Sequence, residues 1–156
     1  MPLRAARTAM VEGALPAVQI APSPLVNPYD GAVASFLGVV RDHHGGLAVA
    51  SLRYDHYGPM AELQLQRIAA EVAARLDAGE LSAPAQPEGH PLHLQILHSY
   101  GELVPGDVSL VVHAASPHRV AAFAACREVV EAIKRDLPVW KLERYADGGE
   151  RYLPGS

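Results

Sequence analysis

The chain has 156 residues, 49% of them hydrophobic, and a formal net charge of −4. This length fits one domain with a core that needs no disulfides, and the acidic balance excludes a general attraction to nucleic acid or anionic lipid. The single cysteine, Cys126, excludes an internal disulfide and fits a cytoplasmic protein, and no apolar run reaches the about 20 residues that span a bilayer. Any anion site must therefore be a local cluster of basic groups.

In the first half of the chain, residues 1–16 are predicted to be a flexible extension. The apolar stretch 31–40 predicts a buried strand, and the alternating residues of 49–57 predict a second strand. The short turn between these strands, DHHGG, predicts that they form a hairpin. A helix over about 60–76 follows Gly58-Pro59 and stops near Gly79. Its apolar stripe consists of Leu65, Ile68, Ala69, Val72 and Leu76.

In the second half, the proline-rich segment 80–91 predicts a loop. Residues 92–100 and 108–115 predict strands joined by a turn at 105–107. A second helix over about 117–137 ends at Pro138, and its apolar face is predicted to consist of Phe123, Cys126, Val130, Ile133 and Leu137. Strands over 139–145 and 151–153 follow. The order β-β-α-β-β-α-β-β predicts one α+β domain over 17–156, with a mainly antiparallel sheet and two principal helices.

A basic pair, His118-Arg119, stands in the first turn of the second predicted helix. Ser116 and Pro117 before it are favoured at the N-cap and the first helical position. Cations at a helix start oppose the helix dipole, so this pair favours a bound anion, most naturally a phosphate. An exposed helix start with two solvated side chains explains the pair equally well. Arg41, at the end of the first strand, is a further candidate for ligand contact, with a solvated arginine as its alternative.

Lysine is rare in this chain, which has eleven arginines but only two lysines, Lys134 and Lys141. Lys134 lies in the last helical turn, and Lys141 shares a strand face with Glu143. The opposite face of that strand, which carries Trp140 and Leu142, is predicted to point into the core. A sharp turn between the helix and the strand would bring the two amines together, where they would lower each other's pKa and could carry acid–base chemistry. The alternatives are a favourable helix-end charge for Lys134 and a solvated strand residue for Lys141.

Other candidate sites are weaker. His43, His44 and His56 lack the spacing of metal ligands, so no metal site is predicted. Cys126 lies on the apolar face of its helix and is predicted to be a packing residue. The chain contains no phosphate-binding P-loop and no dinucleotide-binding glycine motif.

The sequence resembles the catalytic (large) subunit of molybdopterin synthase, the MoaE family, in the stretches GAVASFLGVVRDHHGG, LRYDHYGPMAE, GELVPGDVSLVVHAASPHR and AIKRDLPVWKLE. The resemblance runs from about Gly31 to Tyr152. It implies an α/β-hammerhead-like fold and a sulfurtransferase of molybdenum cofactor biosynthesis, which converts cyclic pyranopterin monophosphate into molybdopterin without a permanently bound cofactor. Sulfur would arrive as a thiocarboxylate on the C-terminal Gly-Gly of a small ubiquitin-like (MoaD-like) partner. The large subunit would form the central homodimer of a heterotetramer.

The resemblance also implies roles for residues. Lys134 and Lys141 fall on the two catalytic lysines of the family. The implied substrate-binding residues are Val39, Val40, Arg41, His118, Arg119, Lys134, Lys141, Leu142 and Glu143. The N-terminal extension, the 80–91 loop and the order HYGPM, where HYPGM is expected, depart from the family pattern.

Two other functions fit parts of this pattern. One is a non-catalytic module that binds a ubiquitin-like sulfur carrier, and the presence of both lysines argues against it. The other is an unrelated enzyme for a phosphate-bearing ligand, with His118 as its acid or base, for which the sequence offers no further support.

Overall fold

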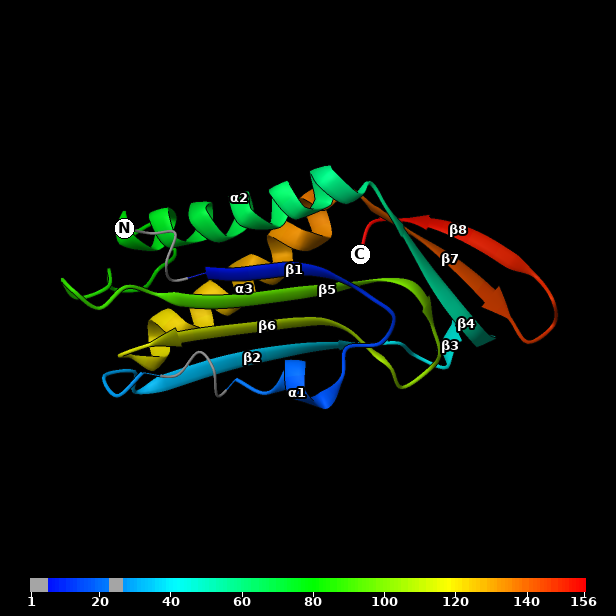
Figure 1. The fold of residues 1–156 in the computed structure, drawn as a ribbon, viewed down its shortest axis with the longest axis horizontal. Helices are drawn as coiled ribbons and strands as arrows, with labels where there is room; N and C mark the ends of the chain where they lie inside the picture. The colour runs from blue at the N-terminus through cyan, green and yellow to red at the C-terminus, as the bar shows by residue number, and fades with distance from the viewer. Residues whose placement is uncertain (1–5, 23–26) are drawn as a thin grey trace.

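The computed structural model describes residues 6–22 and 27–156 (Figure 1). The elements are β1 (Ala6–Glu12), α1 (Ala17–Ile20), β2 (Ala32–Val39), β3 (His43–His44), β4 (Leu47–His56), α2 (Gly58–Asp77), β5 (His93–Leu103), β6 (Val108–Ser116), α3 (Arg119–Asp136), β7 (Val139–Tyr145) and β8 (Glu150–Pro154). The predicted α+β class with a mainly antiparallel sheet is confirmed. Within the described ranges, no helix is long and apolar enough to cross a membrane.

The strands run in the order β2-β6-β5-β4-β7-β8, with β1 added beside β5 and β3 beside β4. The long strand β5 connects two parts of this arrangement. Its first residues pair with β6 and β1, whereas residues 101–103 pair with β4. Figure 1 shows β4, β7 and β8 directed away from the flat part formed by β1, β5, β6 and β2. A cavity lies where these two parts diverge, as described below.

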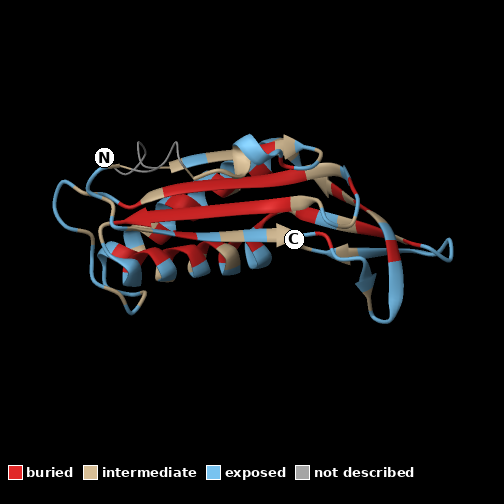
Figure 2. Ribbon diagram, turned by 90° about the horizontal axis from the view of Figure 1, so that it is seen from below, coloured by how far each residue is buried: buried red, intermediate tan, exposed pale blue. Residues whose placement is uncertain are grey.

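The main core lies between α2, α3 and one face of the sheet. The predicted stripe of α2 is confirmed, since all five of its residues are buried. Each of its four larger side chains, those of Leu65, Ile68, Val72 and Leu76, stabilises the fold by about 1.5–3 kcal/mol relative to an exposed one. On the sheet, residues 94–99 of β5 and 109–116 of β6 are all buried, as the red strands of Figure 2 show. Both of their faces are covered, because a smaller cluster of Leu15, Leu97 and Val111 packs with Ile20 of α1.

The predicted hairpin between 31–40 and 49–57 is wrong. β2 pairs with β6 instead, and β4 pairs with β3, β5 and β7. The turn predicted between the two strands contains β3, and His43–His44 form a short hairpin with Leu47–Ala48. Gly45 and Gly46 have φ values of 55° and 81°, and two successive positive φ values match the twist of a tight hairpin. β2 is also less buried than predicted, with Val33, Leu37 and Val39 exposed.

Two aromatic residues predicted to be in the core are exposed. Phe123 on α3 is 68% exposed and Trp140 on β7 is 46% exposed. The buried face of α3 instead consists mostly of small residues: Ala121, Ala122, Ala125, Cys126, Val129, Ala132 and Ile133. Small side chains allow α3 to approach the sheet closely, and a face rich in alanine is easily missed when large apolar residues are sought. The N-cap of α3 is His118 rather than Ser116, which ends β6 and accepts a hydrogen bond from the His118 N–H at 3.2 Å.

The N-terminal segment is not wholly a flexible extension. Residues 6–12 form β1, which pairs in parallel with β5 from Ala6↔Leu94 to Glu12↔Tyr100. The prediction is therefore wrong for these residues, while positions 1–5 of the predicted extension lie outside the described residues.

Candidate functional site

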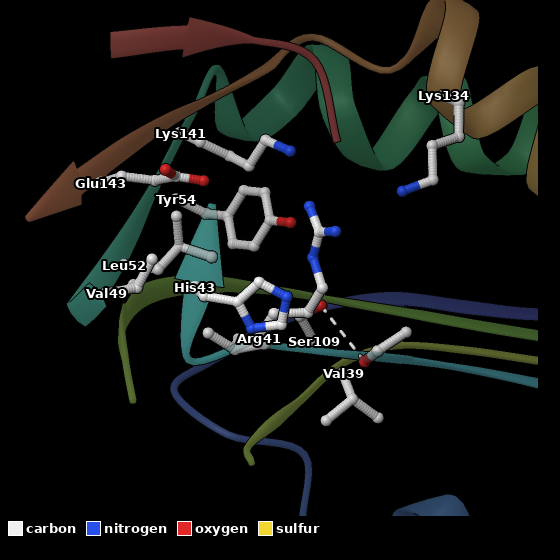
Figure 3. Close-up of a pocket in the computed structure, with 12 residues that line it drawn as sticks. Val39, Arg41, His43, Val49, Leu52, Tyr54, Ser109, Lys134, Lys141 and Glu143 are labelled. Atoms are coloured by element: carbon white, nitrogen blue, oxygen red, sulfur yellow. Dashed lines mark hydrogen bonds between the residues drawn. The ribbon is translucent and has the colours of Figure 1, made fainter. Parts of the chain in front are cut away.

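A cavity of about 260 Å³ lies where the two parts of the sheet diverge (Figure 3). Its walls come from the end of β2, from β3, β4, β6 and β7, and from the last turn of α3. The lining residues are Gly38, Val39, Val40, Arg41, His43, Val49, Leu52, Tyr54, Ser109, Lys134, Lys141 and Glu143. Both lysines of the chain therefore line one cavity.

The positions of the two lysines follow from how α3 ends. Asp136 is the last residue of the helix, and Leu137 has extended backbone angles because the residue before a proline disfavours the helical conformation. The chain turns at Pro138 and returns as β7, which brings Lys141 to the same cavity as Lys134. This placement agrees with the prediction that the turn at Pro138 brings the amines together.

The register between β4 and β7 positions the other wall of the cavity. Tyr54 pairs with Lys141, and Leu52 pairs with Glu143. Residues directly opposite on neighbouring strands point to the same face, so all four side chains face the cavity. Figure 3 shows the Tyr54 hydroxyl and the two lysine amines arranged around the guanidinium of Arg41.

The cavity carries more positive than negative charge. Three of its lining side chains are cations, Arg41, Lys134 and Lys141, and one is a carboxylate. Partial burial lowers the pKa of Lys134, and the nearby charges of Lys141 and Arg41 lower it further. Partial burial also lowers the pKa of Lys141, with Arg41 acting in the same direction and Glu143 against it. The lysines are therefore better proton donors than free lysine, and they make the cavity a site for an anion.

Among the described residues that line the cavity, Glu143 supplies the carboxylate, and this residue is 8% exposed. Burial alone would raise the pKa of Glu143, but hydrogen bonds with His44 and Tyr145 outweigh this effect and lower it. His44 Nδ1 lies 2.8 Å from Oε2, and the Tyr145 hydroxyl donates to the same oxygen at 2.8 Å. Glu143 is thus held ionised in one orientation, on the strand face that it shares with Lys141.

The structure brings together some of the residues expected to bind substrate, but not all of them. Val39, Val40 and Arg41 line the cavity, whereas Leu142 is buried on the opposite face of β7. His118 and Arg119 are exposed at the start of α3. They lie 15–16 residues before Lys134, or roughly 23 Å along the helix at about 1.5 Å per residue. Within one chain, the predicted pocket of Arg41, His118 and Arg119 beside the lysines is therefore not formed.

Some residues near the cavity give no signal in the sequence, and the most notable is His98 on β5, which contacts the lining residue Tyr54. Its side chain is fully buried, and its ring contacts that of Tyr54 edge-on at a centroid distance of 5.0 Å. Burial lowers the pKa of His98 from 6.5 to about 4, and Lys134, His56 and Lys141 contribute in the same direction. No spacing pattern pointed to this residue, because it stands within an otherwise apolar strand.

We expect the buried His98 to make the fold acid-sensitive. Because its pKa is lower in the folded than in the unfolded protein, its contribution to stability is complete above pH 6.5 and is lost as the pH falls toward about 4. The free energy of unfolding should fall by about 3 kcal/mol over this range on account of His98. Urea titrations of the wild type and of His98→Gln at several pH values measure the effect. A slope with pH that is equal in both proteins would contradict the assignment.

A metal site and a nucleophilic cysteine are the two other kinds of site considered from the sequence. In the part of the chain that the structure describes, no group of three or more histidine, cysteine, aspartate or glutamate side chains is placed to hold a metal ion. Cys126 is buried on α3, as predicted, and burial raises the pKa of its thiol to about 11. It therefore lacks the properties of a nucleophile at neutral pH.

Comparison with known proteins assigns the family. The MoaE protein family model matches residues 13–136. The chain is 40% identical over 125 residues to the molybdopterin synthase catalytic subunit of Pseudomonas aeruginosa, covering 80% of this chain and 74% of that protein. Its fold is similar to that of the molybdopterin synthase structure from Staphylococcus aureus, with a TM-score of 0.73 and 29% identity over 93% of this chain and 95% of that one.

A more distant structural neighbour shares the fold. It is a complex of subunits 1 and 2 of molybdopterin-converting factor from Helicobacter pylori, with a TM-score of 0.64, 21% identity, and coverage of 93% of this chain and 88% of that one. The family model covers most of the chain, and the Pseudomonas relative is similar along most of its own length. The chain therefore belongs to the MoaE family, the family of the catalytic subunit of molybdopterin synthase.

Proposed function

We propose that this protein is the catalytic subunit of a molybdopterin synthase and converts cyclic pyranopterin monophosphate to molybdopterin. The observation that carries this proposal is that the only two lysines of the chain line one cavity together with Arg41. Three cations suit a phosphorylated substrate and a thiocarboxylate, and they stabilise negative charge that develops on oxygen during sulfur transfer. The partly buried lysines, with their lowered pKa values, are suited to move protons at the reacting atoms.

The sulfur donor in this proposal is a small ubiquitin-like, MoaD-like partner with a thiocarboxylated C-terminal Gly-Gly. The Helicobacter pylori neighbour is itself a complex of two subunits, which supports a two-protein enzyme. An extended peptide segment fits beside the lysines, since residues 155–156 of this chain lie there, with the Ser156 carbonyl oxygen 3.2 Å from Lys134 Nζ. This protein would supply no sulfur of its own, in agreement with its single buried cysteine. The proposed location is the cytoplasm, where a free thiol such as that of Cys126 stays reduced.

A second copy of the chain would complete the phosphate site. β2 is the last strand of the sheet, and its outer edge has no partner strand among the described residues. The start of β2 adjoins the start of α3, because a Cβ added at Gly31 would lie 2.5 Å from the Pro117 carbonyl oxygen. A two-fold axis that pairs two β2 edges antiparallel would therefore set the start of α3 of one copy beside the end of β2 of the other. This arrangement would bring His118 and Arg119 of the second copy near Arg41.

We expect Arg119→Ala to weaken substrate binding more than it slows the chemical step. Loss of one charge-assisted hydrogen bond to a phosphate costs about 1.5–3 kcal/mol, which corresponds to a KM for the pterin about 10- to 100-fold higher. Steady-state kinetics at saturating partner concentration measure the effect. Arg127→Ala, which removes another exposed arginine from α3, is the matched control and should leave KM unchanged. An unaltered KM in Arg119→Ala would argue against a phosphate contact.

The experiment that tests the function is to mix the purified protein with the thiocarboxylated partner and the pterin and to assay the dithiolene product. We expect product only when all three components are present. A complex with the partner that forms without any product would instead favour a non-catalytic module that binds a sulfur carrier.

A further inference from the structure

His98, which packs against the cavity-lining residue Tyr54, has one ring nitrogen that needs a hydrogen-bond donor. Its Nδ1 lies 2.7 Å from the carbonyl oxygen of Ser99, which can only accept, so Nδ1 carries the proton. Nε2 therefore has a free lone pair. In this structure it accepts a hydrogen bond from the Ser156 hydroxyl, with Nε2 and Oγ 2.7 Å apart. Because the ring is fully buried, this lone pair would be costly to leave without a donor.

The Ser156 segment marks a peptide site with contacts from three elements. The Gly155 N–H donates to the Val139 carbonyl of β7 at 3.1 Å, and the Ser156 carbonyl oxygen accepts from Lys134 Nζ of α3 at 3.2 Å. Tyr54 of β4 lies near Ser156, which lowers the pKa of the Tyr54 hydroxyl against the raising effect of burial. The Ser156 carbonyl thus occupies the place where the acyl oxygen of an incoming tail would meet a catalytic lysine.

The serine hydroxyl lies close to its own carbonyl carbon. Two atoms, Cα and Cβ, separate Oγ from that carbon, so covalent geometry keeps the two about 3–3.7 Å apart, depending on the rotamer. This separation is close to the about 3–3.5 Å of a nucleophile ready to attack. A tail that ends in glycine and is seated like Ser156 has no side chain at this point. The position facing His98 Nε2 would then be open to a water molecule within attacking distance of the acyl carbon.

We propose that His98 positions the water molecule that cleaves the acyl–sulfur bond between the partner's tail and the pterin. The proposal rests on the proposed function, in which sulfur has to leave the acyl carbon of the tail. The water oxygen bonds to that carbon, the carbon–sulfur bond breaks, and sulfur keeps the bonding electrons as a thiolate on the pterin. The tail leaves as a carboxylate. The water is oriented by the hydrogen bond that it donates to Nε2. It loses one proton to solvent as the new bond forms, and the other is lost from the new carboxyl group.

The surroundings of His98 suit this role. Lys134 of α3, Lys141 of β7 and His56 of β4 are the basic groups that act on the ring, and with burial they keep the imidazole neutral at pH 7. A neutral ring keeps its Nε2 lone pair available to accept a hydrogen bond from water and so to orient it. Lys134, which already bonds the Ser156 carbonyl, would stabilise the oxyanion formed from the acyl oxygen.

Two variants of His98 distinguish a role in positioning the water molecule from a role in packing the core. In His98→Asn the side-chain amide can still donate to the Ser99 carbonyl, but nothing reaches the Nε2 position. In His98→Gln an acceptor oxygen reaches the Nε2 position. We expect His98→Asn to hydrolyse the covalent partner–pterin thioester about 10²-fold more slowly, so that this adduct accumulates in a single turnover. Intact-mass spectrometry after an acid quench detects it. We expect His98→Gln to restore most of the hydrolysis.

The matched control is His113→Asn, which alters another buried histidine, on β6, whose ring contacts Ser35 and Ile20 outside the cavity. It should accumulate no adduct. The proposal is overturned if His98→Asn folds and forms product at the wild-type rate without adduct, or if His98→Gln and His98→Asn accumulate adduct equally. A wild-type enzyme that forms no dithiolene at all would instead contradict the proposed function.

A second measurement uses the wild-type enzyme and so does not depend on how His98 variants fold. When the partner's last glycine is replaced by serine and the tail is thiocarboxylated, the new hydroxyl should occupy the water position, as Ser156 does here. We expect the adduct to form and then to persist at least about tenfold longer than with the glycine tail. Equal lifetimes with the two tails would overturn the proposal.

Discussion

Replacing Lys141 by alanine is expected to abolish conversion of the pterin while leaving the fold intact. The amine lies on the cavity wall beside Tyr54 and Glu143, and partial burial lowers its pKa. Removing a cation that stabilises developing negative charge typically costs about 10²- to 10³-fold in rate, and loss of a proton donor adds to this. Product formation in a single turnover, with saturating thiocarboxylated partner, measures the loss. Near-normal turnover would rule out a catalytic role for Lys141.

Two further variants make this result specific. Lys141→Arg keeps the positive charge but cannot lose a proton at neutral pH, so it should recover binding without recovering the proton-transfer contribution. Arg135→Ala removes an exposed cation from the same end of α3 as Lys134, where it pairs with Asp136, and should remain active. Circular dichroism and size-exclusion chromatography of each variant establish that fold and oligomeric state are retained.

At a pterin concentration near the wild-type KM, where Arg119→Ala is strongly impaired, mixing it with Lys141→Ala should restore activity if each site is built from two copies of the chain. In a mixed dimer of Lys141→Ala and Arg119→Ala, one site carries both substitutions and the other carries neither. Random exchange makes about half of the dimers mixed, so the mixture should reach about a quarter of wild-type activity. The two variants are denatured together, refolded and assayed, and compared with the sum of the variants refolded separately.

The same experiment distinguishes the shared site from a site within one chain. If Arg119 acted on the cavity of its own chain, every mixed dimer would contain two defective sites and mixing would recover nothing. That outcome would contradict the dimer arrangement argued from the free edge of β2. A mixture of Lys141→Ala with Lys134→Ala is the control, because both lysines line the cavity of one chain. It should stay inactive, since each site in the mixed dimer loses one lysine.

Much of the fold follows from local patterns in the sequence. The apolar stripe of α2 and the alternation of β4 were predictable because each of these elements has one face toward the core and one toward solvent. Residue polarity therefore follows the period of the element. Strand pairing was less predictable, since β2 pairs with β6 from the far half of the chain. Local turn signals cannot reveal such a partner. Phe123 and Trp140 were assigned to the core from hydrophobicity alone, and such residues remain exposed when small residues fill the inner face.

The part of the candidate site that could be predicted from the sequence consists of rare residue types that lie close together in the chain. Two lysines among eleven arginines, on either side of Pro138, mark one cavity wall. A role for His98 could not be predicted from the sequence, because a single histidine in an apolar strand is usually a packing residue. Its role is indicated only by the hydrogen-bond partners of its two ring nitrogens. His118 and Arg119 were placed beside the lysines by family resemblance, but 15–16 residues of helix separate them within one chain. Their place in a shared site depends on a second copy, which no local pattern describes.

The measurement that tests the account most directly follows dithiolene formation by the wild-type protein, with the thiocarboxylated partner and the cyclic pyranopterin monophosphate, beside Lys134→Ala and Lys141→Ala. The account predicts product with the wild type only when the partner is present, and a loss of about 10²-fold or more with either variant. Product formed without the partner, or formed equally well by both lysine variants, would contradict a sulfur-transfer site built around the two amines.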